Sequence, residues 1–347
     1  MVCLVSGQVV YGLAGGVVLP ALSSMIARWE PRSERGRLAS LIYSGIQVSA
    51  VISPLVTGYI THHQDWRTAF YLLGSLPLAW VLPWLLLVTD LPANSLLTSQ
   101  AERDLLAGEV STSSQRPALR DLPIRRMLTS GPVTGLVVAN VAVQWAATHT
   151  SLLLPLYLHD VLQLPLQQTS LVAALPYLGS CLLGLLSPLL DSRLAQAGLS
   201  PTSARKVSSS LCLFGFAVLS LPVPFVETNT SLTILLTTAA YSMTGFRFVG
   251  SWNNPLDIAP NFAGTLTGLS GMFCYLTAAL VPHTTHIMAD LVGEQNLWTG
   301  LFLLVITAAV LANTTFLLLG TANIQDWNNL SEDRQKLTEQ SEEEPSQ

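Results

Sequence analysis

Two ionisable side chains stand inside long apolar stretches of the sequence, where little water is available to hydrate a charge. Arg247 is the only one of the 16 lysines and arginines within such a stretch, and His149 lies near the middle of another. An arginine at the centre of a membrane helix costs at least about 2.5 kcal/mol, so it should face a hydrated cavity or a partner. Its guanidinium can hold a carboxylate or phosphate through two parallel hydrogen bonds. Arg247 is therefore a candidate anion-binding residue.

Each of these residues also has a simpler interpretation. Arg247 lies seven residues before Asn254, so its long side chain could extend to the headgroups at the nearer end of the span. His149 could stay neutral and hydrogen-bond to a neighbouring helix. Uncharged polar residues within the apolar stretches could line a cavity together with Arg247 and His149, and we call this set the candidate path. Most such polar groups, however, simply join neighbouring helices. The uncharged residues of this set are Tyr43, Gln47, Asn140, Gln144, Tyr177 and Asn254.

Charged residues just outside the apolar stretches form a candidate gate. Glu34 and Arg35 belong to a dense charge cluster after the first stretch, and Asp257 lies between the seventh and eighth stretches. Ion pairs among such residues could hold neighbouring helices together at that end and break when the helices move apart. Two alternatives remain open: basic residues can anchor the chain at the membrane surface, and Asp257 can cap a helix by accepting from free N–H groups.

The sequence contains no motif typical of an enzyme. It has no nucleophile–base pair, no phosphate-binding glycine loop and no cluster of metal ligands. The cysteines, Cys3, Cys181, Cys212 and Cys274, lie in apolar stretches without CxxC spacing, which argues against a zinc site or a disulfide framework. We therefore expect no catalytic residues, no metal and no cofactor. A net charge of −5 disfavours nucleic-acid binding.

The elements that carry these residues are predicted to be membrane helices. Of the 347 residues, 50% are hydrophobic and 11% are charged, whereas about 25% are charged in soluble domains. Nine apolar stretches of roughly 18 residues or more predict transmembrane helices, and they lack the alternation of strands. They run approximately over 2–27, 38–60, 69–89, 132–158, 170–190, 207–224, 232–252, 262–282 and 297–320. The expected fold class is an all-α membrane protein with three plus six helices.

The placement of basic residues predicts the orientation of the chain. If the first loop is cytoplasmic, the loops and tail on that side hold 14 lysines and arginines, and the opposite side holds only Arg67. Asn229, in an Asn-x-Ser sequon, falls on the opposite side, as a glycosylation site requires. Residues 1–89 and 132–320 would then form helix bundles, with a cytoplasmic loop at 90–131 and a cytoplasmic tail at 321–347.

Five segments resemble, in the same order, parts of one family of the major facilitator superfamily. GLAGGVVLPALSSMIARWEPRSERGRL at 12–38 is similar to the fourth helix and following loop of solute carrier family 17, the sialin, vesicular glutamate and sodium/phosphate transporter group. The fifth, sixth and eighth helices of that family resemble YSGIQVSAVISPLVTGYI at 43–60, DWRTAFYLLG at 65–74 and LPYLGS at 175–180. NNPLDIAPNFAGTLTGLS at 253–270 resembles its NHLDIAP element. The resemblance implies a partial major facilitator fold without the first three helices.

The resemblance also implies a function. Members of the family are secondary transporters that couple an organic anion or inorganic phosphate to H⁺ or Na⁺ while two bundles rock around a central site. The implied partners are a small anionic solute and a lipid bilayer, in the plasma membrane or a lysosomal or vesicular membrane. The oligomeric state stays open.

Several positions depart from the family pattern. Gln8 and Val143 replace arginines, Gly15 replaces an acidic residue, and Pro255 replaces a histidine. A second interpretation therefore stays open, in which the chain is a truncated isoform or partial gene model that inserts into the membrane without transporting.

Overall fold

The structure, a computed structural model, describes residues 2–31, 35–89, 94–95, 98–100, 102–103, 122–226 and 228–328. Within these ranges the regular elements are α-helices and 3₁₀-helices, and no strand is present. Apolar side chains cover most faces of these helices. A helix satisfies its backbone N–H and C=O groups internally, which a membrane interior demands.

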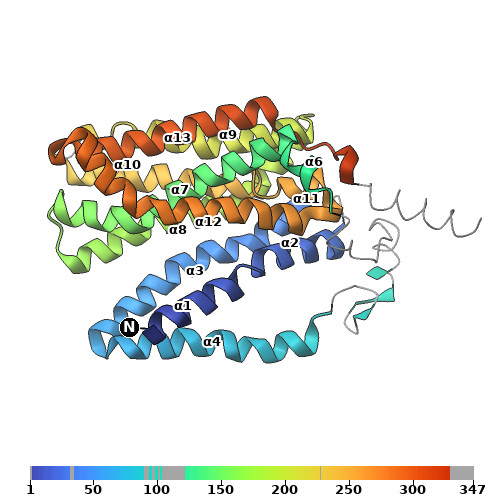
Figure 1. Cartoon of the computed structure of the whole chain (residues 1–347), viewed down its shortest axis with the longest axis horizontal. Coiled ribbons are helices and arrows are strands. Elements are labelled where there is room, and N and C mark those ends of the chain that lie inside the picture. Colours follow the sequence, from blue (N-terminus) through green and yellow to red (C-terminus); the bar gives the residue numbers. More distant parts are fainter. Residues whose placement is uncertain are drawn as a thin grey trace, which may run out of the picture.

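The first set of helices is loosely assembled. It comprises α1 (Val2–Gly15), α2 (Val18–Trp29), α3 (Arg35–His63) and α4 (Trp66–Leu87). In Figure 1, α4 lies far from the larger bundle, whereas α2 and α3 pack against that bundle. The most apolar 18-residue part of α4 has none of its residues buried. The first expected span is interrupted between α1 and α2.

The second set forms a compact bundle, and its longer helices are α7 (Gly131–Asp160), α8 (Leu166–Gln196), α9 (Pro201–Ser220), α10 (Thr230–Ser242), α12 (Ala263–Val292) and α13 (Leu297–Leu319). Short elements connect them: α6 (Ile124–Leu128), η3 (Val223–Phe225), η4 (Met243–Phe248), α11 (Asn254–Ile258), η5 (Pro260–Phe262), η6 (Glu294–Asn296) and η7 (Asp326–Asn328). The main apolar core lies between α7, α9 and α13, where Leu158, Leu213 and Phe316 are buried.

The seventh predicted span, 232–252, is not a continuous α-helix. Eight described helical stretches are long and apolar enough to cross a membrane. The remaining segment consists of α10, with 13 residues, followed directly by η4, with six. At 1.5 Å and 2.0 Å per residue the two rise by about 31 Å, which still matches the hydrocarbon thickness.

A close contact accompanies the change of helix type. The backbone of η4 approaches α8 so closely that a Cβ on Gly245 would collide with Ser180 O and lie 2.6 Å from Gly184 N. Only glycine permits this approach without displacing one of the two backbones. Apolar periodicity gives no sign of such a contact, so the sequence predicted an ordinary helix there.

The loops gather at two ends of the molecule. The end of α2, the start of α3, the elements α6 and α11, and residues 320–328 after α13 lie together at one end (Figure 1). Arg28 and Arg193 lie in the last turns of α2 and α8, which end there, so we call it the basic end. At the opposite end, exposed Asn229 caps α10, and its Oδ1 accepts from Leu232 N at 3.1 Å.

Candidate functional site

Arg247 is buried in η4 and has no ionic partner within the described part of the chain. It is 7% exposed, and its guanidinium carbon lies 5.0 Å from the centroid of the Phe248 ring and 4.5 Å from that of Trp252. Among the residues that the structure describes, no carboxylate forms an ion pair with Arg247, and its Nε has no hydrogen-bond partner. Cation–π contacts stabilise the charge by about 0.5–2 kcal/mol but leave its N–H donors free. Arg247 can therefore still bind an anion.

Aromatic rings connect Arg247 to the first set of helices. Tyr43 of α3 stacks on Phe248 with centroids 6.4 Å apart, and its ring meets Trp252 edge-on at 5.9 Å. On the other side Tyr241 interacts electrostatically with Arg247, and Tyr177 of α8 meets Tyr241 edge-on at 5.0 Å. The structure thus places two predicted path residues, Tyr43 and Tyr177, in one aromatic row with Arg247.

Gln47 joins the same region through hydrogen bonds. Its Nε2 donates to Ser180 Oγ, which lies 3.0 Å from Thr244 Oγ1 in η4. Gln47 is 4% exposed, so its amide lies at the contact between α3 and α8. Gln47 therefore joins α3 to α8, and its place on a substrate path stays a prediction.

Asn140 and Gln144 make mainly structural contacts. Asn140 Nδ2 donates to Ser270 Oγ at 3.2 Å, and its Oδ1 accepts from Ser251 Oγ at 2.7 Å. Asn140 therefore joins α7 to α12 and to the loop after η4, as the alternative interpretation expected. Gln144 Nε2 donates to Thr148 within α7 at 3.3 Å.

His149 lies in a separate pocket inside the second set. Its ring meets Phe302 edge-on at 5.7 Å, and its Nε2 is buried without a hydrogen-bond partner. The structure therefore does not bring His149 together with Arg247, which does not line this pocket. The lining comes from α7, α9, α10 and α13: His149, Thr150, Leu153, Leu154, Tyr157, Phe216, Ser220, Thr237, Ala240, Trp298, Phe302 and Val305.

We expect His149→Leu to stabilise the protein by about 1 kcal/mol, because leaving a buried polar atom unsatisfied costs about 1–3 kcal/mol. Thermal unfolding in detergent measures this effect. Thr150→Val, at the neighbouring lining position, is the control for a general change in pocket polarity. A lower unfolding temperature for His149→Leu would show instead that the imidazole makes a stabilising interaction in the pocket.

Of the three predicted gate residues, the structure describes the side-chain contacts of one. Glu34 lies outside the described residues, and Arg35 begins α3 without a described side chain. Asp257 forms an ion pair with Arg205, with Nε to Oδ2 at 2.7 Å and Nη2 to Oδ1 at 3.3 Å, and its role in a gate stays a prediction. The helix-capping alternative receives no support, since the helices that follow Asp257, η5 and α12, have Ala259 and Phe262 at their N-caps without a side-chain cap bond.

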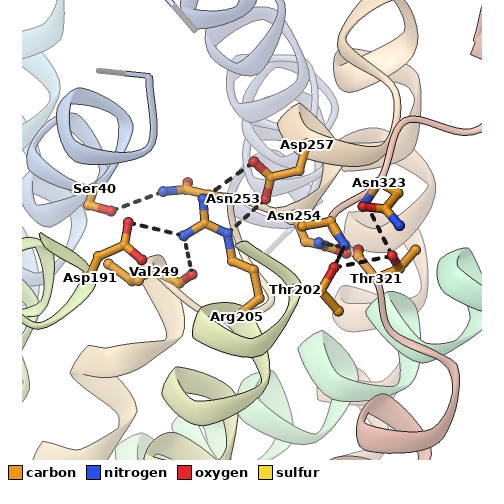
Figure 2. Close-up of polar contacts among 11 residues, drawn as sticks. Ser40, Asp191, Thr202, Arg205, Val249, Asn253, Asn254, Asp257, Thr321 and Asn323 are labelled. Atoms are coloured by element: carbon orange, nitrogen blue, oxygen red, sulfur yellow. Dashed lines mark hydrogen bonds and ion pairs between the residues drawn. The ribbon is translucent and has the colours of Figure 1, made fainter. Parts of the chain in front are cut away.

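Arg205 is the centre of a network at the basic end. Its Nη1 also donates to Val249 O at 2.8 Å and lies 3.5 Å from Asp191 Oδ2 (Figure 2). One guanidinium thus joins α8, α9, α11 and the residue that follows η4. The Arg205 side chain is 9% exposed. The sequence interpretation missed this role because Arg205 was assigned to a loop. The sequence nevertheless carries a signal for this role. Asp191 and Arg205 flank a short turn between two apolar stretches, and this pattern predicts two antiparallel helices.

Neighbouring hydrogen bonds close the contact between the two sets of helices. Asn253 Nδ2 donates to Ser40 Oγ at 2.9 Å, and Thr267 Oγ1 donates to Ser23 Oγ at 2.9 Å. Asn254, a predicted path residue, instead donates to Thr321 O at 2.8 Å within the second set. At the basic end α2 and α3 therefore pack on η4, α11 and α12.

Gly264→Ala should weaken this closure. A Cβ on Gly264 would lie 2.7 Å from Pro20 O and would also collide with Ser24 Oγ across the α2–α12 contact. Overpacking costs about 1–3 kcal/mol, so the closed arrangement becomes less populated. A Ser23→Cys reporter, without the native cysteines, should then react faster with a membrane-impermeant maleimide added at the basic end.

Gly271→Ala is the matched control for Gly264→Ala. Gly271 lies on the same helix, and a Cβ there would meet only Tyr275 Cε2 at 4.0 Å. In the Gly271→Ala variant the Ser23→Cys reporter should therefore react with the maleimide at the parental rate. An unchanged rate in Gly264→Ala would contradict the tight closure at this contact.

Comparison with known proteins identifies the family. The model of the Major Facilitator Superfamily matches residues 2–282. Human sialin is 30% identical over 319 residues, which cover 91% of this chain and 63% of sialin. A probable vesicular glutamate transporter of Caenorhabditis elegans is 28% identical, with 92% of this chain and 55% of that protein covered. Sodium-dependent phosphate transport protein 1 of Rattus norvegicus is 28% identical, covering 92% and 69%.

The chain thus spans less than two thirds of the length of the sialin and vesicular glutamate relatives that it matches. The names of the nematode and rat relatives are those of transport proteins, and the three relatives together confirm the resemblance to solute carrier family 17. The long apolar helices agree with a multi-pass membrane protein. The chain belongs to the major facilitator superfamily.

Proposed function

We propose that the chain is a secondary transporter of a small anion, either an organic acid or inorganic phosphate. The observation that carries this proposal is the buried guanidinium of Arg247, which has no ionic partner among the described residues and lies where α3 meets η4. An arginine fork matches the paired oxygens of a carboxylate or phosphate. An anion bound there would satisfy the guanidinium Nε–H, which the described residues leave without an acceptor.

Coupling to a cation, H⁺ or Na⁺, would offset the charge of the anion as it crosses the membrane. Moving one elementary charge through the membrane potential costs about 2.3 kcal/mol per 100 mV, so neutralising the cargo removes this cost. The name of the rat relative includes sodium dependence, which supports cation coupling in this family.

The basic end would face the cytoplasm, in accordance with the bias of lysines and arginines. The contacts between Ser23 and Thr267 and between Ser40 and Asn253 then form a cytoplasmic gate in the closed state. Opening it requires α12 to move away from α2. The ion pair of Arg205 with Asp257 fixes α11, which leads into α12, and therefore stabilises the closed gate.

Uptake by the purified chain in proteoliposomes tests the proposal. Labelled sialate, glutamate, urate and phosphate are supplied in turn, each with an imposed H⁺ or Na⁺ gradient. Saturable uptake that depends on one gradient supports the proposed function and identifies the anion and the coupling ion.

The absence of saturable uptake for all four anions supports the alternative, a chain that inserts without transporting. The packing of α4 favours that alternative, because none of its most apolar 18-residue part is buried by the rest of the described chain. A transporter bundle normally buries one side of each helix against its neighbours.

A further inference from the structure

After its last long helix the chain crosses the basic end of the bundle. Gly320 directly follows α13 and lies so close to α7 that a Cβ on Gly135 would be 3.3 Å from Gly320 N. The following residues, 321–328, which we call the terminal strap, continue past α9 and α11 and end in η7. Figure 1 shows η7 close to α6 and α11.

The first attachment fixes the start of the terminal strap to α9 and α11. Thr321 O accepts from Asn254 Nδ2 at 2.8 Å, and Thr202 Oγ1 accepts from Ala322 N at 2.9 Å (Figure 2). The hydroxyls of Thr202 and Thr321 are 3.3 Å apart. Asn254, the first residue of α11, is thereby held from one side.

The second attachment fixes the end of the terminal strap to the turn after α11. Gln325 N donates to Ile258 O at 2.8 Å, a carbonyl at the end of α11. Asn261 N donates to Asn328 Oδ1 at 3.1 Å, and Asn261 Nδ2 donates to Asn328 O at 3.2 Å. These bonds satisfy groups that helix ends leave without intrahelical partners.

The third attachment is the side chain of Trp327. It is 6% exposed and lies in an apolar cluster with Ile258 and Phe262, and the rings of Trp327 and Phe262 have centroids 6.2 Å apart. Met127 of α6 belongs to the same cluster. Trp327 therefore packs beneath the segment that connects α11 to α12.

Asp257 lies between these attachments, three residues after Asn254 and four before Asn261. A helix of five residues such as α11 is far shorter than the roughly 12–15 residues that an isolated helix needs, so outside contacts must hold it. We propose that the terminal strap positions Asp257 for its ion pair with Arg205 and so keeps the cytoplasmic gate closed. This inference rests on the proposed function.

The test measures the gate without substrate. The full chain carries the Ser23→Cys reporter in place of its native cysteines, and a membrane-impermeant maleimide is added on the cytoplasmic side of inside-out vesicles. Trp327→Ala should raise the labelling rate about tenfold, within the range typical of coupled sites. Trp327→Phe, which keeps an aromatic ring in the cluster, should label at nearly the parental rate.

Two further variants separate positioning from general destabilisation. Trp298→Ala removes a tryptophan at the opposite end of α13 and should leave the labelling rate unchanged. In an Asp257→Asn background, Trp327→Ala should add little, because the strap acts through Asp257. Asn328→Ala, which removes the acceptor of Asn261 N, gives a milder variant should Trp327→Ala fail to fold.

An unchanged rate in Trp327→Ala, or an equal acceleration in the Asp257→Asn background, would overturn the proposal. Failure of anion uptake would count against the proposed function alone, since labelling does not require transport.

Discussion

Arg247→Leu is expected to abolish anion uptake while the protein remains folded and inserted. Leucine removes the only basic side chain that the sequence places within a span, and no neighbouring cation among the described residues of η4 replaces it. A buried charge without an ionic partner contributes little to stability, so its removal should not unfold the bundle. Uptake in proteoliposomes and thermal unfolding of the same preparation measure the two effects.

Arg247→Lys separates the geometry of the anion site from its charge. Lysine keeps the positive charge but cannot form two parallel hydrogen bonds to one carboxylate or phosphate. A hydrogen bond to a charged group contributes about 1.5–3 kcal/mol, so the KM for uptake should rise by roughly 10-fold to 150-fold. Arg193→Leu, at an exposed position in the last turn of α8, is the control for a general loss of positive charge.

The opposite result has a clear interpretation. Unchanged uptake kinetics in Arg247→Leu would assign the arginine to its aromatic contacts and to the membrane surface, as the simpler interpretation holds. The anion would then bind elsewhere along the contact between the two sets of helices.

Much of the fold follows from composition and apolar length alone. A stretch of 18 or more apolar residues has few alternatives to a helix, because the bilayer offers no water to the backbone. Such stretches therefore predicted α7, α8, α12 and α13, which the structure contains. The change from α10 to η4 could not be predicted this way, since it accompanies the contact of Gly245 with α8.

The site was only partly predictable for a related reason. The burial cost of a charge singled out Arg247 from the sequence, and that argument needs no tertiary information. The partners of Asp257 and His149 depend on which helices become neighbours. Arg205 is 52 residues from Asp257 along the chain, and no local pattern connects the two. For His149, periodicity could not show that its neighbours would line a separate pocket.

Asp257→Ala is expected to have the second largest effect, on both stability and the gate. It removes the carboxylate that pairs with Arg205 through two contacts, and among the described carboxylates it leaves only Asp191, at 3.5 Å, near the buried guanidinium. Removing one partner of a buried ion pair destabilises a protein by about 3–5 kcal/mol. Thermal unfolding should therefore occur at a markedly lower temperature, and the Ser23→Cys reporter should label faster from the cytoplasmic side.

The double variant Arg205→Met with Asp257→Leu distinguishes a gate from a purely structural pair. Replacing a buried ion pair with apolar residues of similar volume is often neutral or stabilising, so the unfolding temperature should recover towards the parental value. The labelling rate should nevertheless stay high, because apolar side chains cannot reproduce the two directional hydrogen bonds from Arg205 that fix the position of α11. If stability and the parental labelling rate return together, the ion pair of Arg205 with Asp257 has only a structural role. If stability alone returns, the ion pair itself keeps the gate closed.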